Sequence, residues 1–294
     1  MQFAFKTSPQ NTTWADLLAV WRAADDIDVY ESGWTFDHFY PIFADSGGPC
    51  LEGWTTLTAL AQATTRLRLG TLVTGIHYRH PAVLANMAAA LDIISGGRLE
   101  LGIGAGWNEE ESGAYGIELG SITERFDRFE EACQVLIGLL SRESTDCFTF
   151  QGAYYQLKAA RNEPKGPQRP HPPICIGGNG EKRTLRITAR YAQHWNFVGG
   201  SPAEFAHKRD VLHAHCADLS RDPKQIRLSA HVRLDPQLDY RKALHYAAEL
   251  GAEGLDLAII YLPAPYDPAV LEPMAEAIRD SGLLTPVQAG PQGG

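Results

Sequence analysis

The chain has 294 residues, of which 44% are hydrophobic, and a formal net charge of −9. This length is typical of one β/α barrel, and the apolar content suffices for a large core without special cross-links. The acidic balance and the scattered basic residues argue against a nucleic-acid-binding protein, which needs a clustered basic face.

The spacing of the cysteines and the length of the apolar runs indicate the cellular compartment of the protein. Five cysteines are widely spaced and form no C-x-x-C pair: Cys50, Cys133, Cys147, Cys175 and Cys216. This usage is typical of free thiols in a reducing cytoplasm, so we expect no structural zinc. No apolar run approaches the ~20 residues that cross a bilayer, and no charged leader precedes residues 1–5. We therefore expect a soluble, unprocessed, cytoplasmic protein that does not contact a membrane.

Apolar strands alternate with amphipathic helices along the chain. Strands are predicted at 2–6, 32–36, 68–73, 99–104, 173–176, 194–198, 227–232 and 255–260. Helices are predicted at 14–26, 55–63, 82–94, 123–140, 181–191, 202–219, 240–250 and 268–281. Eight strand–helix pairs without a break in composition predict a single (β/α)₈ TIM barrel over 1–285. A doubly wound open sheet is the alternative, and 286–294 is expected to be a disordered tail.

Two long segments interrupt this rhythm. Residues 39–53 are too aromatic for a plain linker, and 141–172 form an insertion before the fifth barrel strand that contains the hairpin-like run FTFQGAYYQL. Long ordered loops in barrels are more often lids or interfaces than disordered segments. We expect the substrate to enter between these two segments and 261–266.

Polar residues follow the second predicted strand, at the barrel end where ligands bind. His38 is suited to hydrogen-bonding a cofactor ring or moving a proton near pH 7, with Asp37 orienting the imidazole. The alternative is that both side chains satisfy backbone groups of the loop.

The third predicted strand ends in Thr74 and Gly75. Thr74 is within reach of a ligand and Gly75 permits a bulge, although an ordinary strand-to-loop turn explains the pair as well. His77 and His80 lack a carboxylate or thiolate at a spacing that completes a metal site. His80 is instead expected to fix the start of the next helix.

The fourth predicted strand is followed by Ala105, Gly106 and Trp107. Small residues allow a planar ring to approach the backbone, and the indole offers a stacking face. Asn108 followed by the acidic run 109–111 is explained by helix capping. A glycosidase would need two carboxylates facing each other across the mouth, and only Asp37 and Glu109 are available for that role.

The fifth predicted strand runs into Gly177, Gly178 and Asn179 before a helix. Backbone N–H groups at such a turn suit a phosphate. Lys182, Arg183 and Arg186 form the one local basic cluster of the chain. The turn in this setting favours phosphate binding over a plain turn.

Three segments together resemble a known family: WTFDHFYP (34–41), the run VTGIHYRHPAVLANMAAALDIISGGRLELGIGAGWNEEE (73–111) and PPICIGGNGEKRTLRITARYAQHWN (172–196). They resemble the bacterial luciferase-like monooxygenase superfamily, and within it the branch that uses the deazaflavin coenzyme F420. The resemblance covers nearly the whole chain. It implies a TIM barrel with the cofactor ring across the C-terminal mouth, and a homodimer.

The resemblance also implies roles for individual residues. Asp37 and His38 match the strand-two motif whose histidine contacts the ring, and Thr74 would sit beside the ring. Leu72 and Val73 match a bulge where members often have a non-proline cis peptide. Ala105, Gly106 and Trp107 match the loop that lies over the edge of the ring. Gly177, Gly178 and Asn179 match the turn that binds the phosphate. Lys182 and Arg183 would lie near the acidic tail of F420.

Trp107 stands where sugar-phosphate dehydrogenases of this superfamily carry a glutamate acid. That substrate class is therefore not expected here, and His38 is the expected proton donor. The implied reaction is hydride transfer between C5 of F420 and a small organic substrate. The alternatives are a monooxygenase that uses reduced FMN, a flavin, and a non-catalytic cofactor-binding barrel.

Overall fold

Eight parallel strands close into a barrel in the computed structural model, which describes residues 1–141 and 147–285. The strands are β1 (Gln2–Lys6), β2 (Tyr30–Asp37), β3 (Arg68–Gly75), β4 (Leu99–Gly104), β7 (Ile174–Gly177), β8 (His194–Phe197), β9 (Arg227–Arg233) and β10 (Leu257–Tyr261). β1 pairs with both β2 and β10, which closes the sheet. The (β/α)₈ barrel is confirmed and the open-sheet alternative is wrong. The expected tail at 286–294 lies outside the described residues.

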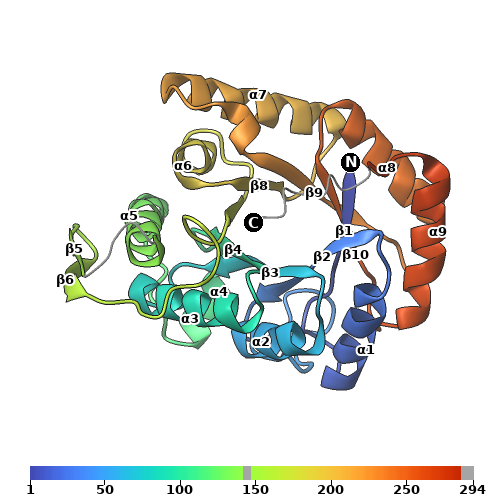
Figure 1. Cartoon of the computed structure of the whole chain (residues 1–294), viewed down its shortest axis with the longest axis horizontal. Coiled ribbons are helices and arrows are strands. Elements are labelled where there is room, and N and C mark those ends of the chain that lie inside the picture. The colour runs from blue at the N-terminus through green and yellow to red at the C-terminus, as the bar shows by residue number, and fades with distance from the viewer. Residues whose placement is uncertain (142–146, 286–294) are drawn as a thin grey trace, which may run out of the picture.

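Helices surround the barrel on its outer side (Figure 1). They are α1 (Trp14–Asp25), α2 (Gly53–Ala63), α3 (Pro81–Ile94), α4 (Glu109–Ala114), α5 (Ile122–Leu140), α6 (Thr184–Tyr191), α7 (Pro202–Asp218), α8 (Tyr240–Ala252) and α9 (Leu271–Ser281). Capping boxes at Thr13, Ser121 and Ser201 start α1, α5 and α7. Such caps satisfy N–H groups that have no partner inside the helix. None of the helices in the described ranges combines the length and apolar character needed to cross a bilayer.

Two predicted helices begin later than expected. Residues 181–183 form turns, and α6 begins at Thr184 without a side-chain cap. The predicted helix 268–281 is a short 3₁₀ helix, η2 (Pro268–Val270), followed by α9. A second 3₁₀ turn, η1 (Pro223–Gln225), precedes β9. These boundaries depend on tertiary contacts that a periodicity argument does not contain.

The insertion before β7 contains the expected hairpin. β5 (Phe148–Gln151) and β6 (Gln156–Ala160) pair antiparallel. Glu131 of α5 accepts hydrogen bonds from the backbone N–H groups of Ala153, Tyr154 and Tyr155 at 2.6, 2.9 and 3.0 Å. The hairpin is therefore held beside α5, away from the strands of the barrel (Figure 1).

A buried ionic network joins side chains of β3, β4, β8 and β9. Glu100 of β4 accepts from Arg68 at 2.9 Å and lies 2.8 Å from Nδ1 of His194, whose Nε2 lies 2.7 Å from Ser229 Oγ. Burial opposes the negative charge of Glu100, but the hydrogen bond from His194 and the charges of His194, Arg68 and Arg227 outweigh it and hold its pKa below the usual range. A buried carboxylate persists here because it is paired on several sides.

The backbone of β3 lies very close to β4 at Gly102. A Cβ built on Gly102 would lie 1.7 Å from the carbonyl oxygen of Thr71. The pairing register of the two strands also shifts between Gly70 and Thr74, which marks an irregularity in β3. Only glycine allows this contact, and the contact positions the end of β3 against β4.

We predict that Gly102→Ala lowers the free energy of unfolding by about 3 kcal/mol, because the added methyl group has no space beside the Thr71 carbonyl. The matched control is Gly113→Ala in α4, where a Cβ meets nothing within 4 Å. We expect the control to stabilise the chain by about 0.5 kcal/mol. Urea denaturation of both variants measures the difference, and equal midpoints would contradict the prediction.

Candidate active site

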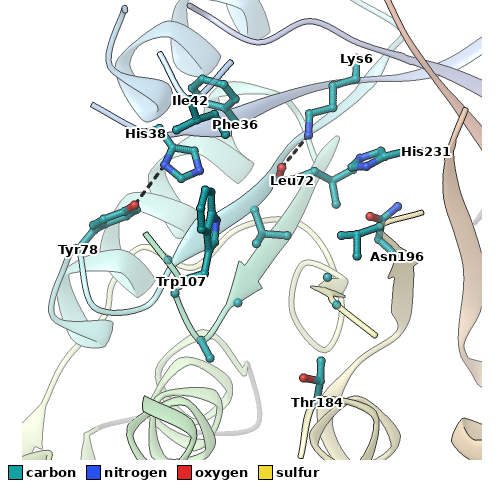
Figure 2. A pocket seen from close by; sticks show the side chains of 18 of the residues that line it. Lys6, Phe36, His38, Ile42, Leu72, Tyr78, Trp107, Thr184, Asn196 and His231 are labelled. Carbon is teal, nitrogen blue, oxygen red and sulfur yellow. Dashed lines mark hydrogen bonds between the residues drawn. The ribbon is translucent and has the colours of Figure 1, made fainter. Parts of the chain in front are cut away.

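A cavity of about 510 Å³ opens at the C-terminal mouth of the barrel. Its lining includes residues at the ends of the barrel strands, among them Lys6, Gly104, Gly177 and Tyr261. Figure 2 shows Lys6 and other lining side chains. The sequence-predicted residues that line it are His38, Leu72, Val73, Ala105, Gly106, Trp107, Gly177 and Gly178. Those that do not line it are Asp37, Thr74, Asn179, Lys182 and Arg183.

His38 is held by Glu111 of α4. Nδ1 of His38 lies 2.7 Å from Glu111 Oε2, and the N–H of Phe39 donates to Oε1 at 2.6 Å. The Tyr78 hydroxyl donates to the same carboxylate and lies 3.3 Å from His38 Nδ1 (Figure 2). An ionised carboxylate only accepts, so Nδ1 of His38 carries a hydrogen and Nε2 is the ring nitrogen left for a ligand.

The expected roles of the acidic residues are corrected by this arrangement. Glu111 orients His38, where Asp37 was expected to do so. Asn108 does cap α4, and its side chain accepts from the Glu111 N–H. Capping nevertheless does not account for the Glu111 side chain, which is fully buried. Burial opposes its charge, yet hydrogen bonds from His38, Tyr78 and Phe39 lower the pKa of Glu111.

Asp37 lies behind the cavity in an ion pair. It is fully buried and accepts from Arg79 at 2.5 and 3.1 Å, while Arg79 also reaches Glu52 at 2.6 Å. Burial raises the pKa of Asp37 despite the guanidinium beside it. Asp37 therefore ties the end of β2 to the start of α2 and to the loop before α3. A glycosidase pair with Glu109 has no support, since Glu109 is exposed and pairs with Arg125.

The end of β3 forms one wall of the cavity. The Leu72–Val73 peptide bond is cis, as the family resemblance implies. The Leu72 carbonyl accepts from Lys6 Nζ at 2.9 Å (Figure 2). Thr74 is fully buried and its hydroxyl accepts from Trp54 Nε1 at 2.9 Å, so it holds α2 and does not face a ligand.

Glycines leave bare backbone on the wall beside Val73. A Cβ on Gly104 would lie 2.8 Å from Val73 Cγ2, and one on Gly177 would lie 3.1 Å from Cγ1. The valine side chain occupies the space that larger residues at these two positions would need. Val73 therefore lies over the glycine backbone of β4 and β7, and these three residues form a wall without bulky side chains, which suits a flat ring.

The turn after β7 differs in detail from the expected phosphate site. Gly178 has a φ of +130°, a conformation that favours glycine, but its N–H donates to Asn196 O at 3.1 Å. Asn179 bridges to the loop after β8, donating to Gly199 O and accepting from the Val198 N–H. Arg183 is paired with Asp127, and Lys182 is exposed.

His80 caps α3, where its side chain accepts from the Ala82 N–H, as expected. Within the described residues, no three His, Cys, Asp or Glu side chains are grouped so as to hold a metal ion. The expected entry route is only partly supported, because Ile42, Phe43 and Tyr261 line the cavity but no residue of 147–172 does.

Sequence reasoning missed a basic wall of the cavity. Lys6 ends β1, while His231 and Arg233 lie at the end of β9, and all three line the cavity. Burial and the nearby charge of Arg233 lower the pKa of Lys6 to about 7. Burial and the charges of Lys6 and Arg233 lower the pKa of His231. The strand-end argument that singled out His38 applies equally to these positions.

The chain matches the model of the luciferase-like monooxygenase family over residues 1–283. It is 35% identical over 184 residues to the phthiodiolone/phenolphthiodiolone dimycocerosates ketoreductase of Mycobacterium tuberculosis, covering 60% of this chain and 45% of that protein. It is 36% identical over 162 residues to the pyrimidine monooxygenase of Methylobacterium radiotolerans, covering 53% of this chain and 40% of that protein.

A further relative is the F420-dependent glucose-6-phosphate dehydrogenase of Amycolatopsis mediterranei, 29% identical over 194 residues, with 65% of this chain and 54% of that protein covered. The chain thus spans about half the length of the curated relatives it matches.

Solved structures share the fold at low identity. An F420-dependent secondary alcohol dehydrogenase has a TM-score of 0.82 at 20% identity, with 95% of this chain and 98% of that chain covered. The F420-dependent tetrahydromethanopterin reductase of Methanopyrus kandleri has a TM-score of 0.77 at 16% identity, covering 94% of this chain and 96% of that chain.

We predict that Glu111→Gln destabilises the chain by about 1–3 kcal/mol, because the buried groups of His38, Phe39 and Tyr78 lose their ionised acceptor. Glu110→Gln, at an exposed position of the same helix, should change stability by less than about 0.5 kcal/mol. Thermal and urea unfolding measure both values. Equal stability of the two variants would show that the Glu111 contacts contribute nothing.

We predict that Lys6 makes stability rise with pH above 7. Its folded pKa is about 7, below the unfolded value of about 10.4, so the unfolded chain binds the extra proton between these values. The wild-type free energy of unfolding should therefore increase relative to Lys6→Met, with a slope approaching about 1.4 kcal/mol per pH unit. Urea titrations at pH 6 to 9 test this, and a difference that does not vary with pH refutes it.

Proposed function

The chain belongs to the luciferase-like monooxygenase family, and from this premise we propose that it is an oxidoreductase that uses coenzyme F420. The proposed reaction is hydride exchange with a small organic substrate. The observation that carries the proposal is the cavity at the barrel mouth, which the small residues Gly104 and Gly177 line on one side and His38, held by Glu111, lines on another.

The residues present fit a flat tricyclic ring. The walls at Gly104 and Gly177 have no side chains, and Val73 fills the space beside them. Gly177, Gly178 and Thr184 line the cavity beside the start of α6, where the helix N-terminus favours an anionic group such as a phosphate. Leu72, Val73, Ala105 and Trp107 would contact the ring, and Asn179 would keep the phosphate turn in shape.

The chain supplies orientation, exclusion of water and proton transfer. When bound, F420 supplies hydride exchange at C5 of its deazaflavin ring. Phe36, Ile42 and Trp107 give the cavity apolar walls that exclude water. His38 Nε2 would exchange the proton of the substrate oxygen, while Glu111 holds the hydrogen on Nδ1 and keeps the ring in one orientation.

The names of the relatives suggest which substrates to test first. A ketoreductase, a secondary alcohol dehydrogenase and a sugar-phosphate dehydrogenase all interconvert an alcohol and a carbonyl. We therefore propose that the substrate carries a hydroxyl or carbonyl carbon that lies next to His38. The alternative is a monooxygenase that uses reduced FMN, which the similarity to a pyrimidine monooxygenase favours.

We predict that the purified chain binds F420 at least ten times more tightly than FMN, measured by fluorescence titration. Gly178→Asp should weaken F420 binding at least tenfold, because a carboxylate would oppose the phosphate. Ser201→Asp adds the same charge at the N-cap of α7, outside the cavity, and should leave binding unchanged. Tighter binding of FMN would support the monooxygenase alternative, and binding of neither would refute both.

We further predict that His38→Asn lowers kcat by about 10²–10³, the usual contribution of a general acid or base. The assay follows F420 absorbance with a panel of secondary alcohols and ketones, after F420 affinity has been shown to be unchanged. A variant with wild-type kcat would remove His38 from the proposed mechanism.

A further inference from the structure

Three basic side chains share one wall of the cavity, on the opposite side from His38. In the barrel sheet Lys6 pairs with Tyr261, and Tyr261 pairs with Arg233 in the next strand. His231 lies two residues before Arg233, and all three basic residues line the cavity. Figure 2 shows Lys6 and His231 on one side of the space and His38 and Trp107 on the other.

No carboxylate pairs with this wall among residues 1–141 and 147–285. The ion pairs of that part of the chain involve neither Lys6 nor Arg233. Nε2 of His231 is buried and has no hydrogen-bond partner there. Lys6 is buried, so its charge beside Arg233 is costly unless a ligand supplies a counter-charge.

Aromatic rings hold the wall in place. The Arg233 guanidinium lies 5.4 Å from the ring centroids of both Phe43 and Tyr261. Lys6 Nζ lies 5.1 Å from the Tyr261 centroid and donates to the Leu72 carbonyl, which leaves further N–H groups of the ammonium for a ligand. These contacts position both cations before any ligand arrives, which reduces the entropy cost of binding.

The charge of the wall matches a monoanion. Arg233 is charged at all relevant pH values, and its planar guanidinium suits the two oxygens of a carboxylate. With a pKa of about 7, Lys6 is about half protonated at neutral pH. The lowered pKa of His231 keeps that ring neutral. The wall thus carries between one and two positive charges, which a single carboxylate balances.

We propose that Lys6, His231 and Arg233 form a recognition site for a carboxylate group of the substrate. This inference rests on the proposed function, because it takes the bound molecule to be the substrate of that reaction. The substrate is then a hydroxy acid or a keto acid. The carboxylate lies against the basic wall, and the reacting hydroxyl or carbonyl carbon lies towards His38.

The test uses the cofactor-free protein, so that it does not depend on F420. Butyrate and its neutral isostere butyramide are titrated at pH 6.5, with binding followed by calorimetry and NMR line broadening. We expect butyrate to bind at least ten times more tightly than butyramide. Equal binding of the two, or binding of neither, overturns the proposal. Tighter binding of inorganic phosphate than of butyrate overturns the assignment to a carboxylate.

Variants locate the site. Lys6→Met and Arg233→Gln should each weaken butyrate binding at least tenfold, and Lys158→Met, at an exposed position on the β5–β6 hairpin, should leave it unchanged. If Lys6→Met fails to fold, Arg233→Gln decides alone, because the Arg233 side chain is exposed. Wild-type butyrate affinity in folded Arg233→Gln overturns the proposal.

Two further measurements separate this site from the cofactor. Butyrate binding should persist when F420 is added, and competition between the two would assign the wall to the cofactor and overturn the proposal.

The affinity for butyrate should fall as pH rises above 7, because Lys6 loses its charge. The groups that face Lys6 in this titration are Arg233, His231, Tyr261, Cys175 and the Leu72 carbonyl. Affinity that does not vary with pH would exclude Lys6 from the site.

Discussion

Burying the Glu111 carboxylate at the mouth of the barrel requires hydrogen-bond donors on several sides. Those donors come from the loop after β2, as His38 and the N–H of Phe39, and from the loop after β3, as Tyr78. Glu111 itself belongs to α4, after β4. One buried charge therefore joins three consecutive strand–helix loops into a single rigid wall. The position and tautomer of His38 follow from it.

The two sides of the cavity differ in how their charged side chains are paired. Near His38 two buried carboxylates are paired, Glu111 with His38 and Asp37 with Arg79. Across the mouth the cations of β1 and β9 share aromatic contacts instead of carboxylates. Deeper in the barrel, Glu100 is again matched by His194 and Arg68. A cavity with one paired wall and one uncompensated basic wall is polarised before any ligand is present.

Much of the fold could be read from local patterns, because periodicity and capping are properties of short segments. Pro81 and His80 mark the start of α3, and the alternation in 99–104 marks β4. The start of α6 was misplaced, because the turns at 181–183 lack a side-chain cap and depend on neighbouring segments. His38 and the glycines at 106, 177 and 178 were also recognisable, since each follows a predicted strand or ends it.

The sequence alone determined the barrel, the strand ends that carry the cavity and the histidine beside it. Only the tertiary structure decided which side chains at those ends turn inward. Thr74 turns towards Trp54, and Asp37 turns towards Arg79. By contrast, Lys6 lies near His231 and Arg233, although more than two hundred residues separate them along the chain. The physical reason is closure of the barrel. It brings β1 beside β10, and β10 beside β9, and buried charges then select their partners by distance in space rather than along the chain.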